Sequence, residues 1–303
     1  GALAPAADPQ RWWGVVDSTI APDPLIPADA PVRLSATALS GLAQCPTRWF
    51  LQRRAEASTP RPSSAGFGSL LHAAIAAVHS GELPAEAQAM TDAIRPAFDL
   101  LPYEADWEAA RAWQAAREAI DRFLTWHGAR GREVVSAELD FDVVTEVPGD
   151  QVRLVGAVDL VDVGPDGVDV VDFKTGKTVP TRADAACDLQ LGVYQRAIAD
   201  VEQVAGRTVA GARLVYLAKG SGKPTCREQA GLTSDDSWLD EAFADAVHTL
   251  RSEELPARPD LTKRCERCSL RPMCPAWGQL EWIDAPGPPE PAGEASMLPG
   301  FQP

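Results

Sequence analysis

The stretch QVRLVGAVDLVDVGPDGVDVVDFK, residues 151–174, decides the fold of this protein. Two runs within it, 151–162 and 168–173, are rich in valine and leucine and read as strands. Between them, Pro165-Asp166-Gly167 supplies the residue types that favour a tight turn. The pattern therefore predicts two neighbouring strands joined as a hairpin.

This hairpin carries acidic side chains. The turn would bring Asp159 and Asp172 close together, where two carboxylates can hold Mg²⁺ or Mn²⁺ through oxygen ligands. Side chains two apart on a strand share a face, so Lys174 would point the same way as Asp172. A metal there would polarise a phosphoryl oxygen and lower the pKa of a bound water, while the lysine orients that water or stabilises charge on the phosphate. The alternative is a hairpin with incidental surface charges, because D-x-K alone is a common sequence.

Upstream of the hairpin, apolar residues follow a helical period. We expect two short helices over 35–54, broken at Pro46, with Ser35 or Thr37 as the first cap. A Ser/Pro-rich loop follows at 55–66. The further expected elements are helices at 67–80, 85–99 and 104–128, and then a strand at 133–146.

Downstream of the hairpin, the sequence predicts a helix over 184–205, a strand over 209–218 and a helix over 235–252. The order is helices, then β-β-β-α-β, then a helix. It predicts an α/β fold with a central mixed sheet flanked by helices.

The chain has 303 residues, of which 45% are hydrophobic, enough for one sizeable core or two small ones. We expect an irregular N-terminal arm or linker over 1–34, a folded domain over 35–282, and a disordered tail over 283–303. No apolar run approaches the roughly 20 residues of a membrane span, and no signal peptide is visible. The missing initiator Met suggests a piece of a longer protein.

Four other polar residues are candidates for the same site. Glu138 lies on the expected strand before the hairpin, and His72 ends the helical sequence Gly68-Ser69-Leu70-Leu71-His72. Gln190 and Tyr194 are four apart on a helix and so share a face. Each residue also has a simpler interpretation. Glu138 would be an exposed strand glutamate and His72 a packed or surface histidine. Gln190 and Tyr194 would take part in ordinary helix packing.

Taken together, the series resembles the RecB-type branch of the PD-(D/E)xK nucleases. Its elements are Gly68-x-x-x-His72, Glu138, Gly156-x-x-Asp159, Asp172-x-Lys174 and Gln190-x-x-x-Tyr194, in the order found in that family. The resemblance spans about 35–280 and implies a restriction-endonuclease-like core. It implies that His72, Asp159, Asp172 and the carbonyl of Phe173 are metal ligands, and that Lys174 is the catalytic lysine.

The cysteines form a second group. Cys265, Cys268 and Cys274 are closely spaced, and Cys45 stands 220 positions upstream of Cys265. Four thiolates suit either Zn²⁺ or an iron–sulfur cluster, and the spacing alone does not decide. The alternative is three free thiols and a buried Cys45. Cys187 and Cys226 have no partners in this pattern, and we interpret them as structural.

The cysteine arrangement resembles that of the iron–sulfur RecB-type nucleases, which include AddB, the AdnA and AdnB subunits and the CRISPR-associated exonucleases. The resemblance implies a [4Fe–4S] cluster that ties the two ends of the domain together. The net charge of −15 has the wrong sign for a nucleic-acid protein. Basic residues nevertheless lie around both cysteine segments, and we expect them to form one local positive patch: Arg48, Arg53, Arg54, Arg61, Lys263, Arg264, Arg267 and Arg271.

The resemblance implies an Mg²⁺- or Mn²⁺-dependent exonuclease that acts on DNA ends, as the nuclease domain of a bacterial helicase–nuclease in double-strand-break repair. The expected setting is the bacterial cytoplasm, near the nucleoid, with a helicase domain or partner subunit and no membrane. The sequence contains no helicase P-loop. Two alternatives stay open: a catalytically silent DNA-binding scaffold of the same fold, and a small zinc module on an unrelated α/β enzyme.

Overall fold

The computed structural model describes residues 24–57, 63–233, 236–252, 254–258, 263–274 and 276. The chain divides into two compact units. The large unit comprises Gly1–Gln44 and Pro60–Leu255, and the small unit comprises Cys45–Thr59 and Pro256–Pro303. Most of the expected N-terminal arm, and all of the expected C-terminal tail, lie outside the described residues.

The large unit is built on a mixed sheet, which confirms the predicted α/β class. The strand order is β1-β3-β4-β5-β6, with β2 paired to β3. The pairs β1/β3 and β4/β5 are parallel, and the other pairs are antiparallel. The strands are β1 (Val32–Leu34), β2 (Glu133–Val147), β3 (Asp150–Gly164), β4 (Gly167–Lys174), β5 (Val209–Tyr216) and β6 (Thr225–Ala230).

The predicted hairpin is the centre of this sheet. Gly164 and Gly167 face each other at its closed end, and Leu160 pairs with Val171 further along. Gly167 has a φ of 124°, and a Cβ there would collide with the carbonyl oxygen of Thr208, so glycine is required at this turn. Continued by one position beyond Leu160 and Val171, this register places Asp159 across from Asp172.

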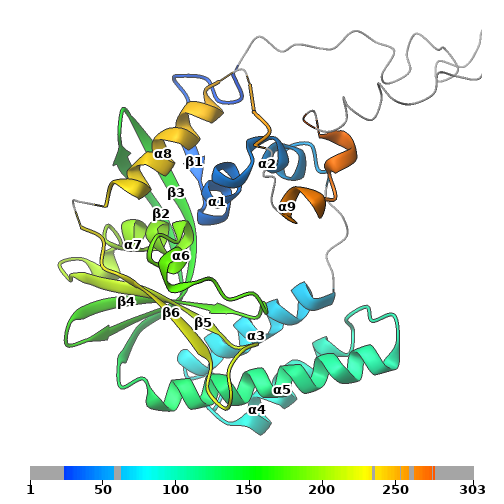
Figure 1. Ribbon diagram of the computed structural model, residues 1–303. Coiled ribbons are helices and arrows are strands. Elements are labelled where there is room, and N and C mark those ends of the chain that lie inside the picture. Colours follow the sequence, from blue (N-terminus) through cyan, green and yellow to red (C-terminus); the bar gives the residue numbers. More distant parts are fainter. Residues whose placement is uncertain are drawn as a thin grey trace, which may run out of the picture. The chain divides into compact units, whose positions relative to one another are not determined.

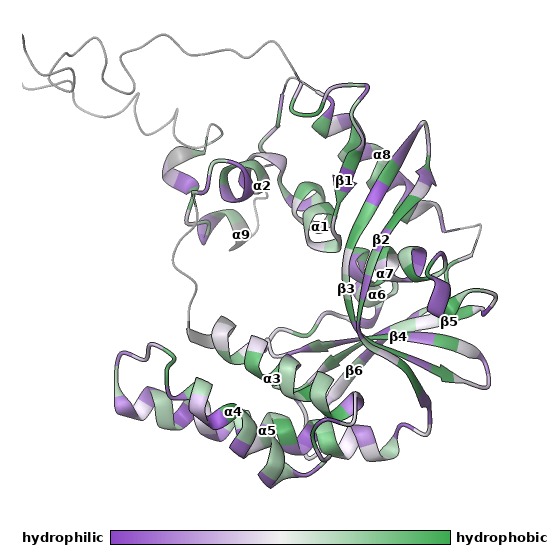
Figure 2. Ribbon diagram, turned by 180° about the vertical axis from the view of Figure 1, so that it is seen from behind, coloured by the Kyte–Doolittle hydropathy of each residue, from purple (hydrophilic) through white to green (hydrophobic). Residues whose placement is uncertain are grey.

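Helices cover both faces of the sheet (Figure 1). On one face, α3, α4 and α5 pack with Leu160, Val171 and Phe173 in one apolar cluster. On the other face, α7 contacts β2 to β5, and α1 and α8 pack on α7. Figure 2 shows apolar and polar segments alternating along α4 and α5, as expected for helices with one buried side. These helices are α1 (Ala36–Gln44), α3 (Ser63–His79), α4 (Ala87–Phe98), α5 (Asp106–Ala129), α7 (Leu189–Ile198) and α8 (Ser237–Leu250).

The single helix predicted over 184–205 is wrong. The chain instead forms α6 (Arg182–Ala186), α7 and a 3₁₀ turn, η3 (Glu202–Val204). Thr181 and Asp184 form a capping box at α6, and the Asp188 carboxylate accepts a hydrogen bond from the Leu191 N–H to start α7. Each new cap begins a new helix, which explains the break.

The small unit contains α2 (Pro46–Arg53), α9 (Lys263–Glu266) and η4 (Arg271–Met273). The predicted break between two helices at Pro46 is confirmed, because α1 ends at Gln44 and Pro46 is the first residue of α2. No helix in the described part of the chain is both long enough and apolar enough to cross a membrane.

Candidate metal centre and lysine network

Asp159 is held in place through both of its carboxylate oxygens. Oδ1 lies 3.2 Å from Nδ1 of His72, which α3 brings over the sheet. Oδ2 accepts a hydrogen bond of 2.7 Å from the backbone N–H of Phe173 on β4. The helix and both strands of the hairpin therefore fix the orientation of this carboxylate.

Glu138 completes a group of three possible metal ligands. The ligand atoms of His72, Glu138 and Asp159 all lie within 4.8 Å of one another. On β2, Ala137 and Leu139 pair with Leu160 and Val158 of β3, so Glu138 lies opposite Asp159. Glu138 has a φ of 48°, in the left-handed region that non-glycine residues rarely adopt and that is often found at functional sites.

This group lines an open cavity of about 590 Å³, with Gly68, Ser69, Ala73 and Thr175 around the three ligands. Two carboxylates and one imidazole are a donor set that fits a divalent cation. Oxygen donors suit Mg²⁺ and Mn²⁺, and the imidazole adds a nitrogen donor that transition metals accept. The donor chemistry of this cavity therefore fits the predicted metal.

Lys174 is held in a second, adjoining network. Its Nζ lies 2.7 Å from Oδ2 of Asp172 and donates a hydrogen bond of 2.6 Å to Oε1 of Gln190. The amide nitrogen of Gln190 in turn donates to Oδ1 of Asp172 at 2.9 Å and to the hydroxyl oxygen of Tyr194 at 2.8 Å. Helix α7 thus positions the lysine through one glutamine.

Burial and charge shift the acid equilibria of these groups. Burial raises the pKa of Asp172 to about 6, against the opposing effect of Lys174 and with a further increase from Asp159. Burial and the Asp159 charge likewise raise the pKa of Glu138. For His72, burial lowers the pKa, but the hydrogen bond to Asp159 and the nearby carboxylates outweigh it, and the net pKa is raised. The site therefore concentrates negative charge that a bound cation would neutralise.

The structure brings the predicted site residues together in two groups. His72, Glu138 and Asp159 form one group, and Asp172, Lys174, Gln190 and Tyr194 form the other. The Asp172 carboxylate lies toward Lys174 and Gln190, outside the three-ligand group, although its charge acts on His72. Phe173 reaches the site through its backbone N–H.

The four predicted cluster cysteines all belong to the small unit. Cys45 directly precedes α2, Cys265 lies in α9, and Cys268 and Cys274 lie at successive backbone turns. Each is half-buried, and no disulfide joins any of the six cysteines, all of which the structure describes. In the predicted basic patch, Arg61 and the side chains of Lys263 and Arg264 lie outside what is described, while the other five arginines belong to the small unit.

Sequence reasoning missed a buried charge cluster on the opposite face of the hairpin. Asp162 and Asp169 are paired across β3 and β4 and are nearly inaccessible to solvent. Arg132 lies 3.0 Å from Asp169 and 3.7 Å from Asp162, and Arg213 also pairs with Asp169. These residues alternate with the apolar strand positions, but nothing in the sequence showed which face they would occupy. Because the aspartates are paired with arginines, we interpret this cluster as structural.

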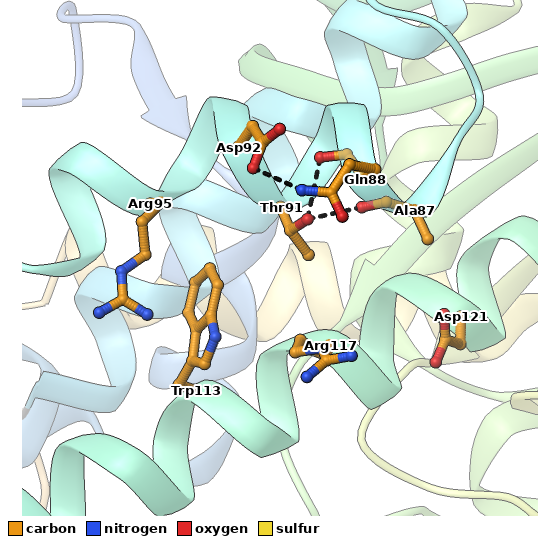
Figure 3. Close-up of a pocket in the computed structure, with 8 residues that line it drawn as sticks. All are labelled: Ala87, Gln88, Thr91, Asp92, Arg95, Trp113, Arg117 and Asp121. Atoms are coloured by element: carbon orange, nitrogen blue, oxygen red, sulfur yellow. Dashed lines mark hydrogen bonds between the residues drawn. The ribbon is translucent and has the colours of Figure 1, made fainter.

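A separate cavity of about 460 Å³ lies between α4 and α5 (Figure 3). It is lined by Arg95, Trp113 and Arg117 together with acidic residues, and the Arg95 guanidinium lies 4.5 Å from the centre of the Trp113 ring. None of the predicted site residues lines it.

The sequence profile of the PD-(D/E)XK nuclease superfamily matches residues 33–275, and the chain belongs to this superfamily. No curated protein matches the sequence. Among solved structures, the chain is similar to the one titled "Crystal structure of SSO0001", with 15% identity and a TM-score of 0.40, over 81% of this chain and 86% of that chain. Nucleases of this superfamily use divalent metals such as Mg²⁺ or Mn²⁺, and the fold implies DNA as substrate.

Proposed function

We propose that this protein is a metal-dependent DNA nuclease that hydrolyses phosphodiester bonds with a metal-activated water. The observation that carries the proposal is the convergence of His72, Glu138 and Asp159 beside the Asp172–Lys174 pair. When bound, a divalent metal would polarise a phosphoryl oxygen and lower the pKa of a bound water. His72, Asp159, Asp172, Glu138 and the carbonyl of Phe173 are the groups that would hold it.

The residues of the lysine network have separate roles in this proposal. Lys174 orients the attacking water and stabilises negative charge on the phosphate. Asp172 and Gln190 hold its ammonium group by contacts of 2.7 and 2.6 Å. Tyr194 accepts a hydrogen bond from Gln190 and so orients the glutamine. Gln190 and Tyr194 therefore act as positioning residues for Lys174.

The proposed nuclease activity is tested by cleavage of labelled DNA with Mn²⁺ or Mg²⁺, comparing the wild type with Asp172→Ala. The wild type should cut and Asp172→Ala should lose at least about a hundredfold in rate, since one essential catalytic contact is worth roughly that much. Asp142→Asn is the matched control, because Asp142 is exposed on β2 and pairs with Arg153 outside the site. Inactivity of the wild type with both metals would favour the silent DNA-binding scaffold.

We further propose the RecB-type setting: an exonuclease domain over 35–282, preceded by a linker and followed by a tail, in a bacterial helicase–nuclease that processes DNA ends. The order of the site motifs along the chain supports it. The partner would be a helicase domain or subunit, and the compartment would be the cytoplasm near the nucleoid. End-labelled linear and circular substrates test the exonuclease mode, because an exonuclease leaves the closed circle intact.

For the small unit we propose a [4Fe–4S] cluster on Cys45, Cys265, Cys268 and Cys274. Support comes from the compact unit that unites the Cys45 segment with the segment after Pro256. The test is anaerobic purification followed by visible absorption and by iron, sulfide and zinc analysis. Cys45→Ala should lose iron and sulfide, and Cys187→Ala, which removes an exposed thiol of the large unit, should not. A colourless protein with one zinc would reject the iron–sulfur cluster.

A further inference from the structure

A second cavity of the large unit adjoins the metal centre. Its volume is about 400 Å³, and Thr175, directly after Lys174, lines both this cavity and the one that contains the metal ligands. On α3, Phe67 lines the second cavity while its neighbour Gly68 lines the first. The two cavities therefore share Thr175 at the end of β4 and are lined by neighbouring residues of α3.

The wall of this second cavity combines aromatic and basic side chains. Phe67 and Tyr103 supply rings, and Arg111 and Lys177 supply exposed positive charges. No ion pair or hydrogen bond to either basic side chain is found among the described residues. Arg111 and Lys177 thus place two positive charges at an exposed cavity of a protein whose net charge is −15, and this local charge is suited to bind an anion.

The other charged residues of the cavity are already engaged. Arg122 donates hydrogen bonds to the carbonyl oxygens of Leu217 and Gly220 and to the Glu118 carboxylate. Glu108 accepts a hydrogen bond from the backbone N–H of Glu104. The Tyr103 hydroxyl oxygen, by contrast, is shielded from solvent and has no hydrogen-bond partner in the described part of the chain. The cavity is thus lined by two cations that make no ion pair with any described residue and by two rings that also contact Phe98.

We propose that this cavity holds a nucleotide of single-stranded DNA next to the phosphate that is cut. Aromatic rings that stack on bases and cations that contact phosphates are the combination that binds single strands without sequence preference. A volume of about 400 Å³ is in the range that holds one small ligand. One turn before Arg111 on α5, Trp107 is 69% exposed and offers a further ring beyond the cavity. The proposal rests on the proposed nuclease function, because it gives the path of that substrate.

The test measures the affinity of a short fluorescent single strand by anisotropy, in EDTA so that nothing is cut, over a range of salt concentrations. The variant Arg111→Ala with Lys177→Ala should weaken binding at least about tenfold. The slope of the logarithm of the binding constant against the logarithm of salt concentration should also become shallower by up to about 1.4. Each phosphate contact on a single strand contributes roughly 0.7 to this slope. Both side chains are exposed, so the variant should fold.

The matched control is Arg117→Ala combined with Arg95→Ala. It removes the same amount of positive charge, but from α4 and α5 at the cavity of Figure 3, and it should bind the strand like the wild type. Equal weakening by both double variants would overturn the proposal in favour of a general charge effect. Loss of duplex binding with unchanged single-strand binding would also overturn it, in favour of a duplex surface. So would a wild type that does not bind the strand.

The outcomes separate this proposal from the nuclease reading. If the Arg111/Lys177 variant binds more weakly and the wild type never cuts DNA, the result would support the nucleotide site and reject the nuclease. Normal binding and cutting by that variant would reject the nucleotide site and leave the nuclease unaffected.

Discussion

Gln190 is the residue of α7 that contacts the candidate catalytic lysine directly. Its side chain accepts from Lys174 and donates to both Asp172 and Tyr194. Gln190→Ala should therefore lower the cleavage rate about 10- to 100-fold, the usual cost of losing a group that orients a ligand or a catalytic residue. Single-turnover kinetics at saturating DNA should show the loss in the rate constant rather than in DNA affinity.

Tyr194→Phe provides the comparison for this prediction. It keeps the ring contact with Phe141, whose centre lies 6.0 Å away, and removes only the oxygen that Gln190 contacts. The rate should fall less than in Gln190→Ala. A larger fall in Tyr194→Phe would mean that the hydroxyl acts directly on the substrate.

His79 makes stability depend on pH. Burial, with the charges of Arg130 and His127, lowers the pKa of His79 to about 4. An unfolded chain would bind a proton near pH 6.5 and the folded chain only near pH 4, so this stabilising effect is complete above pH 6.5 and is lost as the pH falls toward 4. Because His79 is partly exposed, we expect a loss on the order of 1–2 kcal/mol in the free energy of unfolding.

Urea unfolding at pH 7, 5.5 and 4.5 measures this effect. His79→Phe keeps an aromatic ring beside Phe173 but cannot bind a proton, so its stability should fall less over this range. His248→Asn, at an exposed position on α8, should keep the wild-type profile. A wild-type profile in His79→Phe would assign the pH dependence to other groups.

At the residue scale, the site residues on the hairpin itself were predictable, because local sequence determines which of its side chains lie close together. Asp159, Asp172 and Lys174 follow from one turn and the two-residue period of a strand. Glu138 was also a sequence candidate, and its alignment with Asp159 follows from the β2/β3 turn, because the pairing runs without a shift from Val147 and Asp150 to Ser136 and Val161. The register shift between Val134 and Ser136, farther from that turn, was not predictable, because the local sequence gives no sign of an added residue in a strand.

At the scale of elements, the approach of α3 to the end of β4 controls the geometry of the site. A Cβ at Gly68 would lie 2.9 Å from Oγ1 of Thr175, closer than normal contact. Gly68→Ala should therefore push α3 away from β4 and displace His72, one turn further along the helix. Alanine is favoured over glycine in a helix by about 1 kcal/mol, so the variant should lose cleavage activity without a matching loss of stability.

Parallel measurements of thermal unfolding and of cleavage test this prediction. Gly128→Ala is the control, because it lies in α5 with no atom within 4 Å of the added Cβ. It should cut DNA at the wild-type rate. Full activity in Gly68→Ala would show that Thr175 can move aside without disturbing the metal ligands.

The helices and strands with a strong period were predicted close to their observed bounds, and the short ones were not. β1 has three residues and β6 has six, with the polar sequence TCREQA, so neither carries a clear strand pattern. β6 is a strand because its backbone pairs with β5 from Gly211 to Tyr216. Such pairing depends on the neighbouring strand, which a local pattern cannot contain.

At the scale of the whole molecule, the small unit should depend on its proposed cluster and the large unit should not. Removing the cluster by chelation, or by Cys45→Ala, should greatly speed hydrogen exchange at amides of the turns around Cys268 and Cys274. Amides of β3 and β4 should keep their protection, because their pairing lies within the large unit. Hydrogen exchange with mass spectrometry measures both in one experiment.

Cys187→Ala should leave both units unchanged in that experiment. Unchanged exchange of the small unit in Cys45→Ala would show that its packing alone holds it together. The sequence also predicted that the two ends of the domain belong together, on the basis of the cysteine spacing and the family resemblance. The structure places both segments in one compact unit.

The division of the chain into units also has a consequence for biosynthesis. The small unit needs both Cys45–Thr59 and the residues after Pro256, whereas the last strand of the sheet ends at Ala230. During translation from the N-terminus, the sheet is complete while the first half of the small unit still lacks its partner. The proposed cluster could therefore be loaded only after the residues of the sheet have been made, so a shortage of iron and sulfide would leave a folded sheet with an open small unit.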